Sequence, residues 1–236
     1  MNATTAAVAR HPHLAIARPA GFVRVDCHSH TMWSGDATTT PHELIEAVAA
    51  SAIDVLCITD HSTTNGAVEL ADRLGCRVVV GEELRTGVGE LMGLFLTERI
   101  PFGVQPDEFC LRVRGQGGIV YVPHPFDPTR NALQERVLRD LADRGLLDAI
   151  EIFNGKVSLE HLNAKAAVFA AEADLPGGAG SDAHVPDALG AAFIDMPDFA
   201  TPAEFLVALR SGVIHGHHFD QARAWRARIV PSVKTT

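Results

Sequence analysis

The chain alternates short apolar segments with helical segments along most of its 236 residues, and this alternation limits the folds open to it. Apolar runs of roughly four to eight residues that end in polar residues are typical of buried strands. At 40–53, Thr40 can cap a helix, Pro41 suits its first position and Glu43 completes a capping box. We expect strands at 22–28, 54–61, 77–83, 90–96, 118–124, 147–154, 176–184, 193–197 and 213–219, and helices at 40–53, 66–75, 106–116, 131–145, 158–173 and 202–212.

Strands that alternate with helices of about ten residues predict βαβ units and a parallel sheet. So many units in one chain favour closure of the sheet into a barrel, whose active-site groups lie at the carboxyl ends of the strands. The length suits one domain. We therefore expect a single α/β barrel over residues 22–216, preceded by a partly ordered leader (1–21) and followed by a C-terminal extension (217–236).

Composition and charge argue against several function classes. The chain is 47% hydrophobic and 21% charged, which suits a globular core, and its net charge of −9 without any Lys/Arg run argues against an extended nucleic-acid or membrane surface. The longest clean apolar run, 91–96, is too short to span a bilayer, and the first twenty residues lack the apolar stretch of a signal peptide. Four cysteines without C-x-x-C spacing suit free thiols, so we expect a cytoplasmic protein and leave its oligomeric state open.

Two histidines close the first predicted strand, in the segment DCHSHTMWSGD at residues 26–36. Side chains alternate faces along a strand, so His28 and His30 point the same way and can share one metal ion. Taken alone, the pair is equally consistent with two unrelated histidines near a turn. The segment His11-Pro-His13 repeats the pattern where no strand is expected, and we expect no ligand role for it.

Nearly every predicted strand ends in a residue that can bind a metal ion. With 12 histidines in 236 residues, four strand ends carrying histidine by chance are improbable. Because these ends meet at one edge of a barrel, the pattern predicts a metal centre there. The residues concerned are His28 and His30, Asp60 and His61, Glu82, His124, Glu151 and Asn154, and Asp182 and His184.

The ordered motifs resemble those of the PHP family, named for polymerase and histidinol phosphatase. They are HSH (28–30) followed by SGD, ITDH (58–61), GEE (81–83), VPHP (122–125) and GSDAH (180–184). The resemblance covers roughly residues 22–216 and implies a distorted seven-stranded (β/α)7 barrel. It also implies two to three divalent ions, manganese, iron or zinc, as cofactors.

Carried over position by position, the resemblance implies three ion sites. It assigns His28, His30, Glu82 and Asp182 to the first ion. The second would be held by Glu82, His124 and Glu90, and the third by Asp36, His61 and His184. Glu82, Asp182 and His184 would also act in catalysis.

Two departures from the family pattern stand out. The family often has S-D-G where this chain has S-G-D, so the reach of Asp36 depends on a loop. The family commonly has a histidine where this chain has Glu90, and a carboxylate oxygen there favours manganese or iron over zinc.

Four further residues have expected supporting roles. Asp60 is expected to orient a ligand imidazole, because such histidines usually donate their second N–H to a carboxylate or carbonyl. Arg130, Lys156 and Arg85 follow strand ends and are candidates for holding a phosphate or carboxylate of the substrate. The alternative for each cation is a solvated surface side chain.

The function implied is hydrolysis of a phosphoester in a small phosphorylated metabolite or nucleotide by a metal-activated hydroxide. Two alternatives stay open. One is an amidohydrolase-like C–N or lactone hydrolase, since barrels host many chemistries. The other is a metal-binding domain without turnover.

Overall fold

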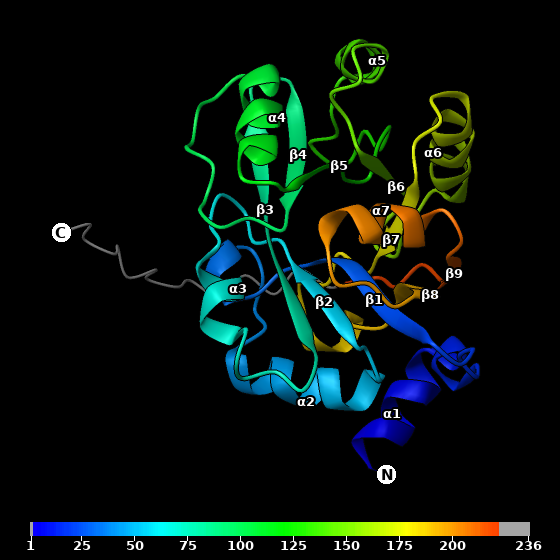
Figure 1. Ribbon diagram of the computed structural model, residues 1–236. Helices are drawn as coiled ribbons and strands as arrows, with labels where there is room; N and C mark the ends of the chain where they lie inside the picture. Colours follow the sequence, from blue (N-terminus) through cyan, green and yellow to red (C-terminus); the bar gives the residue numbers. More distant parts are fainter. Residues whose placement is uncertain (1, 222–236) are drawn as a thin grey trace, which may run out of the picture.

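The computed structural model describes residues 2–221 (Figure 1). Over these residues the strands form one sheet in the order β7-β6-β5-β4-β3-β2-β1-β8-β9. The strands are β1 Phe22–Ser29, β2 Val55–Ile58, β3 Arg77–Thr86, β4 Gly89–Leu94, β5 Ile119–Val122, β6 Ala149–Asn154, β7 Gly177–Gly180, β8 Ala192–Pro197 and β9 Val213–Gly216. The α-helices are α1 Ala3–Arg10, α2 Pro41–Ser51, α3 Asn65–Leu70, α4 Pro106–Gly115, α5 Glu135–Asp143, α6 Glu160–Glu172 and α7 Pro202–Leu209.

The sheet is mixed, whereas the sequence predicted a parallel one. Strands β1, β2 and β3 are parallel, as are β5, β6 and β7, but β4 runs antiparallel to both of its neighbours. Only Gly87 and Val88 separate β3 from β4, and so short a turn joins antiparallel strands, since a parallel pair needs a crossover of about a dozen residues. Strands β8 and β9 also pair antiparallel, next to β1.

The chain just beyond β7, the strand at one end of the sheet, meets the carboxyl end of β1, which nearly closes the barrel. A bridge pairs Ser29 with Ala183, just beyond β7. His30 N donates to Ala183 O at 2.9 Å, and Asp182 N donates to His28 O at 2.8 Å. The closure therefore brings the HSH and GSDAH motifs side by side.

Helices cover the outside of the sheet in two groups (Figure 1). Helices α4, α5 and α6 pack on β3–β6, and α1, α2 and α3 pack near β1–β3. Phe205 of α7 and Phe199 belong to one buried cluster with the first residues of β2, β5 and β6, Val55, Ile119 and Ala149. Because α7 covers the amino ends of these strands, the carboxyl ends are left for a site. The capping box expected for the helix at 40–53 is present in α2, between Thr40 and Glu43.

The predicted leader contains regular structure. Helix α1 and a 3-10 helix, Pro12–Ala15, lie within it, and Ala7 and Leu14 join a buried cluster with Leu44 and Val48 of α2. Beyond β9, residues 217–221 continue as an extended segment, and the rest of the expected C-terminal extension lies outside the described residues. The division into leader, barrel and extension stays a prediction.

Candidate metal centre

A pocket of about 550 Å³ opens at the carboxyl ends of the strands. Its floor is formed by side chains that follow β1, β2, β5 and β7 and by residues of β3 and β4. This is the edge at which the sequence predicted a metal centre. The polar and charged residues that line it include Ser34, Asp36, His61, Glu83, Arg85, Glu90, His124, Arg130, Lys156, Asp182, His184 and Gln221.

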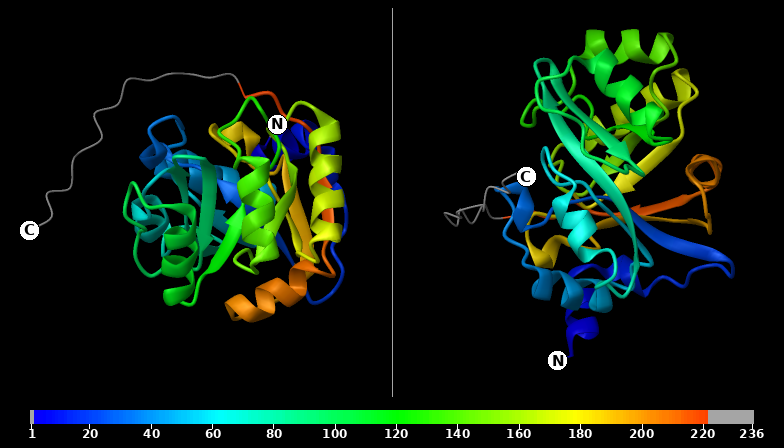
Figure 2. Two further views of the ribbon diagram at one scale, coloured as in Figure 1. Left: turned by 90° about the horizontal axis from the view of Figure 1, so that it is seen from above. Right: turned by 60° about the vertical axis from the view of Figure 1, so that its left-hand side comes forward.

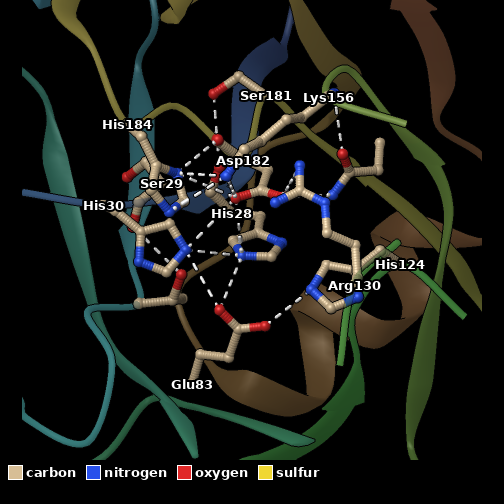
Figure 3. A network of polar contacts seen from close by, with 12 residues as sticks. His28, Ser29, His30, Glu83, His124, Arg130, Lys156, Ser181, Asp182 and His184 are labelled. Carbon is tan, nitrogen blue, oxygen red and sulfur yellow. Dashed lines mark hydrogen bonds and ion pairs between the residues drawn. The ribbon is translucent and has the colours of Figure 1, made fainter. Parts of the chain in front are cut away.

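Four buried side chains converge at the centre of this floor (Figure 3). The Nε2 atoms of His28 and His30 lie 3.0 Å apart, and each lies 3.2 to 3.4 Å from Glu83 Oε2. Asp182 Oδ1 lies 3.7 Å from His28 Nε2 and 3.5 Å from His30 Nε2. Ligands about 2.0–2.2 Å from a tetrahedral ion are roughly 3.3–3.6 Å apart, so the four atoms are spaced as ligands of one metal ion.

The tautomers of the two histidines also fit a cation. His28 Nδ1 lies 3.3 Å from Glu151 Oε1, and His30 Nδ1 lies 2.8 Å from Ser34 Oγ, whose own hydrogen is directed to Asp60. Each Nδ1 is therefore assigned as the donor, which leaves both Nε2 atoms with lone pairs facing each other at 3.0 Å. Two neutral rings in this arrangement would repel each other, so the space between the Nε2 atoms suits a metal ion. Burial acts to lower the pKa of His28, but the carboxylates of Asp182, Glu151 and Glu83 raise it well above its usual value. Without the ion, a proton on His28 therefore relieves the repulsion.

The structure corrects the assignment of Glu82, because the neighbouring Glu83 faces the centre instead. Successive residues of β3 point to opposite sides. Glu82 points away and accepts a hydrogen bond from Ile100 N at 2.6 Å, and burial raises its pKa to about 7. Burial also acts to raise the pKa of Glu83, but the charges of His61 and His28 outweigh it and hold that pKa well below its usual range.

A second group of ligand atoms surrounds the other oxygen of Glu83. His124 Nε2 lies 2.9 Å from Glu83 Oε1 and 3.7 Å from Glu90 Oε2, so Glu90 lies beside His124. His124 Nδ1 is buried without a hydrogen-bond partner among the described residues. His28, Glu83 and His124 can together hold one ion, and so can His61, Glu83 and Glu90. Glu83 thus belongs to more than one candidate group of ligands, whereas the sequence analysis predicted Glu82 in that position.

The residues of the third expected group, Asp36, His61 and His184, also lie close together. Asp36 Oδ2 lies 3.4 Å from His61 Nε2 and 3.5 Å from His184 Nε2. Gly35, in a left-handed conformation with φ of 81°, turns the chain so that Asp36 reaches the site despite the S-G-D order. Burial acts to raise the pKa of Asp36, but its contacts with His184 and His61 lower that pKa overall.

Asp60 supports the centre less directly than expected. Its carboxylate accepts hydrogen bonds from Thr31 N and Thr31 Oγ1, both at 2.6 Å, and from Ser34 Oγ at 3.0 Å. Ser34 in turn contacts His30. Asp60 therefore orients a ligand histidine through a serine.

Glu151 has a supporting contact that the sequence assignment left out. It contacts His28 Nδ1 and accepts hydrogen bonds from His124 N at 2.7 Å and Asn154 Nδ2 at 2.9 Å. In the sequence, only its position at a strand end indicated that Glu151 belongs to the site. That position does not distinguish a metal ligand from a residue that orients one.

The three candidate cations all line the pocket. Arg130 and Lys156 are largely buried, and each lies 3.5 Å from an oxygen of Asp182. Burial acts to raise the pKa of Asp182, but Lys156, His28 and Arg130 hold it well below its usual range. Arg85 is 62% exposed and contacts Glu90 at 3.0 Å, so it lies at the rim.

Within residues 2–221, no helix is both long enough and apolar enough to cross a membrane.

Comparisons with known proteins place the chain in a family. The PHP domain model matches residues 26–102, and the PHP-associated model matches residues 160–214. The uncharacterized protein MJ1587 of Methanocaldococcus jannaschii is 37% identical over 145 residues, which cover 56% of this chain and 82% of that protein. The uncharacterized protein MJ0417 of the same organism is 33% identical over 197 residues, which cover 80% of this chain and 79% of that protein.

A solved structure confirms the expected α/β barrel. A two-domain protein from Bacteroides vulgatus containing a predicted PHP-like metal-dependent phosphoesterase superposes with a TM-score of 0.68 at 18% identity. The match covers 86% of this chain and 67% of that one, so the fold is a distorted (β/α)7 barrel. Together with the matched sequence models and the two relatives, this shows that the chain belongs to the PHP family of metal-dependent phosphoesterases and related hydrolases.

Proposed function

We propose that the protein hydrolyses a phosphoester bond of a small phosphorylated substrate with the help of bound divalent ions. The observation that carries the proposal is the placement of Arg130 and Lys156, which approach the metal-facing carboxylate Asp182 from inside the pocket. Two largely buried cations beside a metal centre suit a multiply charged anion, because a phosphoryl group offers oxygens to both the ions and the cations.

The pocket favours a small substrate. Its volume of about 550 Å³ lies within the range of small-molecule sites, roughly 300–1,000 Å³. The net charge of −9 also gives little attraction for an extended nucleic acid, so the local cations and ions must supply the attraction for an anion. A nucleotide and a sugar phosphate both meet these requirements.

His28, His30, Glu83 and Asp182 would hold the first ion, with Glu83 shared with a second ion at His124 and Glu90. Divalent ions held there supply Lewis acidity and lower the pKa of a water molecule toward neutrality. The guanidinium of Arg130 and the ammonium of Lys156 would bind the phosphoryl oxygens and orient the group. The carboxylate of Glu90 favours manganese or iron at the second ion.

The test is a screen for hydrolysis by protein loaded with manganese, iron or zinc. It follows release of phosphate from monoesters, release of p-nitrophenol from bis(p-nitrophenyl) phosphate, and loss of substrate for amides and lactones. The panel contains p-nitrophenyl phosphate, bis(p-nitrophenyl) phosphate, sugar phosphates and nucleotides, alongside amides and lactones. We expect release from at least one phosphoester, and a loss of about a hundredfold in D182N, about 2.7 kcal/mol. No phosphoester hydrolysis by the metal-loaded wild type would overturn the proposal, and turnover of an amide or lactone instead would favour the alternative hydrolase.

A matched pair of lysines tests substrate binding. K156M should raise KM for the best phosphoester at least tenfold, because it removes a largely buried cation from the pocket. K165M removes an exposed lysine of α6 that pairs with Glu135, and its KM should equal that of the wild type. Equal KM values in both variants would place the substrate away from Lys156.

A further inference from the structure

We propose that Gln221 is a positioning residue that holds the metal-facing loop of Asp182 and His184 in place. Gln221 is 9% exposed and lies against this loop at the edge of the pocket. It ends the extended segment 217–221 that follows β9, called here the strap. The proposal rests on the metal centre of the proposed function. It assigns a role in metal affinity to a residue far along the chain from the ligand motifs.

The amide of Gln221 is bonded to the loop on both of its polar sides. Its Oε1 accepts a hydrogen bond from His184 N at 2.7 Å. Its Nε2 donates to Asp182 O at 3.1 Å and to Ser181 O at 3.4 Å. One side chain thus contacts the backbone of Ser181, Asp182 and His184, three of the four residues 181–184 of the GSDAH motif. A primary amide offers an acceptor and a donor side by side, and the reversed orientation would place like groups together.

The backbone at Asp182 needs such support. Its φ of 48° lies in the left-handed region, which a non-glycine residue adopts at an energetic cost and keeps only where the surroundings enforce it. From one side, Asp182 N donates to His28 O in β1. From the other side, Gln221 binds Asp182 O. Loss of the hydrogen bond from Gln221 allows the backbone at Asp182 to relax. The Asp182 carboxylate then turns away from His28 and His30.

The strap is itself anchored along its length. His217 N donates to Ala191 O at 3.0 Å, and Phe219 N donates to Gly155 O at 2.8 Å. His217 Nε2 lies 2.8 Å from His11 Nδ1 in the leader, and the ring of Phe219 packs edge-on against His11 at 5.1 Å. In the left view of Figure 2, the last described residues (red) run across the upper edge of the barrel. These contacts fix the position from which Gln221 reaches the loop.

The experiment measures binding of Mn²⁺ to metal-free protein by isothermal titration calorimetry. Q221M keeps the length of the side chain and removes both hydrogen-bonding groups, and we expect its tightest Mn²⁺ site to weaken at least tenfold, as for other residues that support metal ligands. D220N changes the exposed neighbouring residue of the strap and should bind Mn²⁺ like the wild type. The melting temperature of metal-free Q221M should stay within about 2 °C of the wild-type value.

Wild-type Mn²⁺ affinity in Q221M would overturn the proposal, whether KM or the melting temperature changes or not. If Q221M folds poorly, Q221N serves in its place, because its amide is one methylene too short to reach His184 N and Asp182 O together. Since the readout is metal binding, a protein that binds Mn²⁺ but hydrolyses no phosphoester would count against the proposed function alone.

Discussion

Two groups of histidines in this protein show how differently the same side chain is used. The strand-end histidines face carboxylates and line or lie beneath the pocket. The histidines of the second group, called here the leader group, connect the leader to the strap. The strand-end group consists of His28, His30, His61, His124 and His184, and the leader group consists of His11, His13 and His217.

The partners of the two groups explain the difference. Glu83 alone lies within 3.4 Å of four strand-end histidines, so negative charge and nitrogen lone pairs accumulate together. In the leader group, His11 Nε2 lies 2.9 Å from Asp187 O and His13 Nε2 lies 2.7 Å from Gly190 O. Burial, together with the charges of His217, His13 and Arg10, lowers the pKa of His11 to about 4. Nearby carboxylates therefore distinguish the candidate metal centre from the packed histidines of the leader group.

The largest expected effect comes from the carboxylate at the centre of the first group. E83Q should lower phosphoester hydrolysis about a thousandfold, about 4 kcal/mol, because Glu83 is placed to bridge two ions. E82Q changes the adjacent carboxyl group, which faces away and still can accept from Ile100 N, so its rate should stay within about threefold of the wild type. The measurements are the initial rate of hydrolysis and the metal content per chain of each variant. A larger loss of rate in E82Q than in E83Q would reverse our assignment.

Removal of the ions should separate the two groups thermodynamically. At free metal about a hundredfold above Kd, binding stabilises the native state by about 2.7 kcal/mol, so a chelator should lower the melting temperature by about 5–10 °C. H30N should abolish this shift, whereas H11N should retain it. Differential scanning fluorimetry with and without chelator measures both, and an equal shift in H30N would exclude His30 as a ligand.

The leader group should make the metal-free protein less stable in acid. The pKa of His11 is about 4 when folded and returns to about 6.5 on unfolding, so between these values the unfolded state binds more protons. The contribution of neutral His11 to the free energy of unfolding is therefore complete above pH 6.5 and is lost as the pH falls toward 4. Between pH 7 and pH 5 the free energy of unfolding should fall by about 2 kcal/mol. Urea unfolding should show this loss in the wild type and a smaller loss in H11N.

A matched control sharpens this pH test. H42Q replaces an exposed histidine of α2 and should keep the wild-type loss of stability between pH 7 and pH 5. If H11N keeps the full loss as well, the leader histidines do not titrate with folding as described.

The smallest effect is expected at the rim of the pocket. Arg85 contacts Glu90 but is largely exposed, and exposed ion pairs contribute only about 0–1 kcal/mol. R85Q should therefore raise KM for the best phosphoester by about threefold with little change in kcat. R73Q removes the exposed partner of Glu69 of α3 and should leave both constants unchanged. If R85Q raised KM as much as K156M does, the phosphate would lie nearer the rim than we propose.

Local patterns were sufficient to predict most elements. The expected helix at 40–53 is α2 with its capping box, and the apolar runs became strands whose carboxyl ends carry the predicted His28, His61 and His124. Pattern alone did not predict the direction of β4, because the apolar run at 90–96 fits either direction. The two-residue turn before it was the decisive local signal.

The choice between Glu82 and Glu83 was beyond the sequence alone. Both are buried at the same strand end, and they differ only in the face to which each points. That face follows from the pairing of β3 with β4 and from the bridge between His61 and Glu83. The register of neighbouring strands is a property of the folded sheet, so the tertiary structure decided which carboxylate enters the centre.

By itself, the sequence determined the alternation of strands and helices, the one edge at which the ligand residues gather, and the presence of two His-x-His segments. Only the tertiary structure decided what those histidines do. His28 meets Glu151, 123 positions away, and His11 meets His217, 206 positions away. An imidazole binds a metal ion or stays neutral according to the charges within a few ångströms of it, and those neighbours are brought together only when the barrel closes.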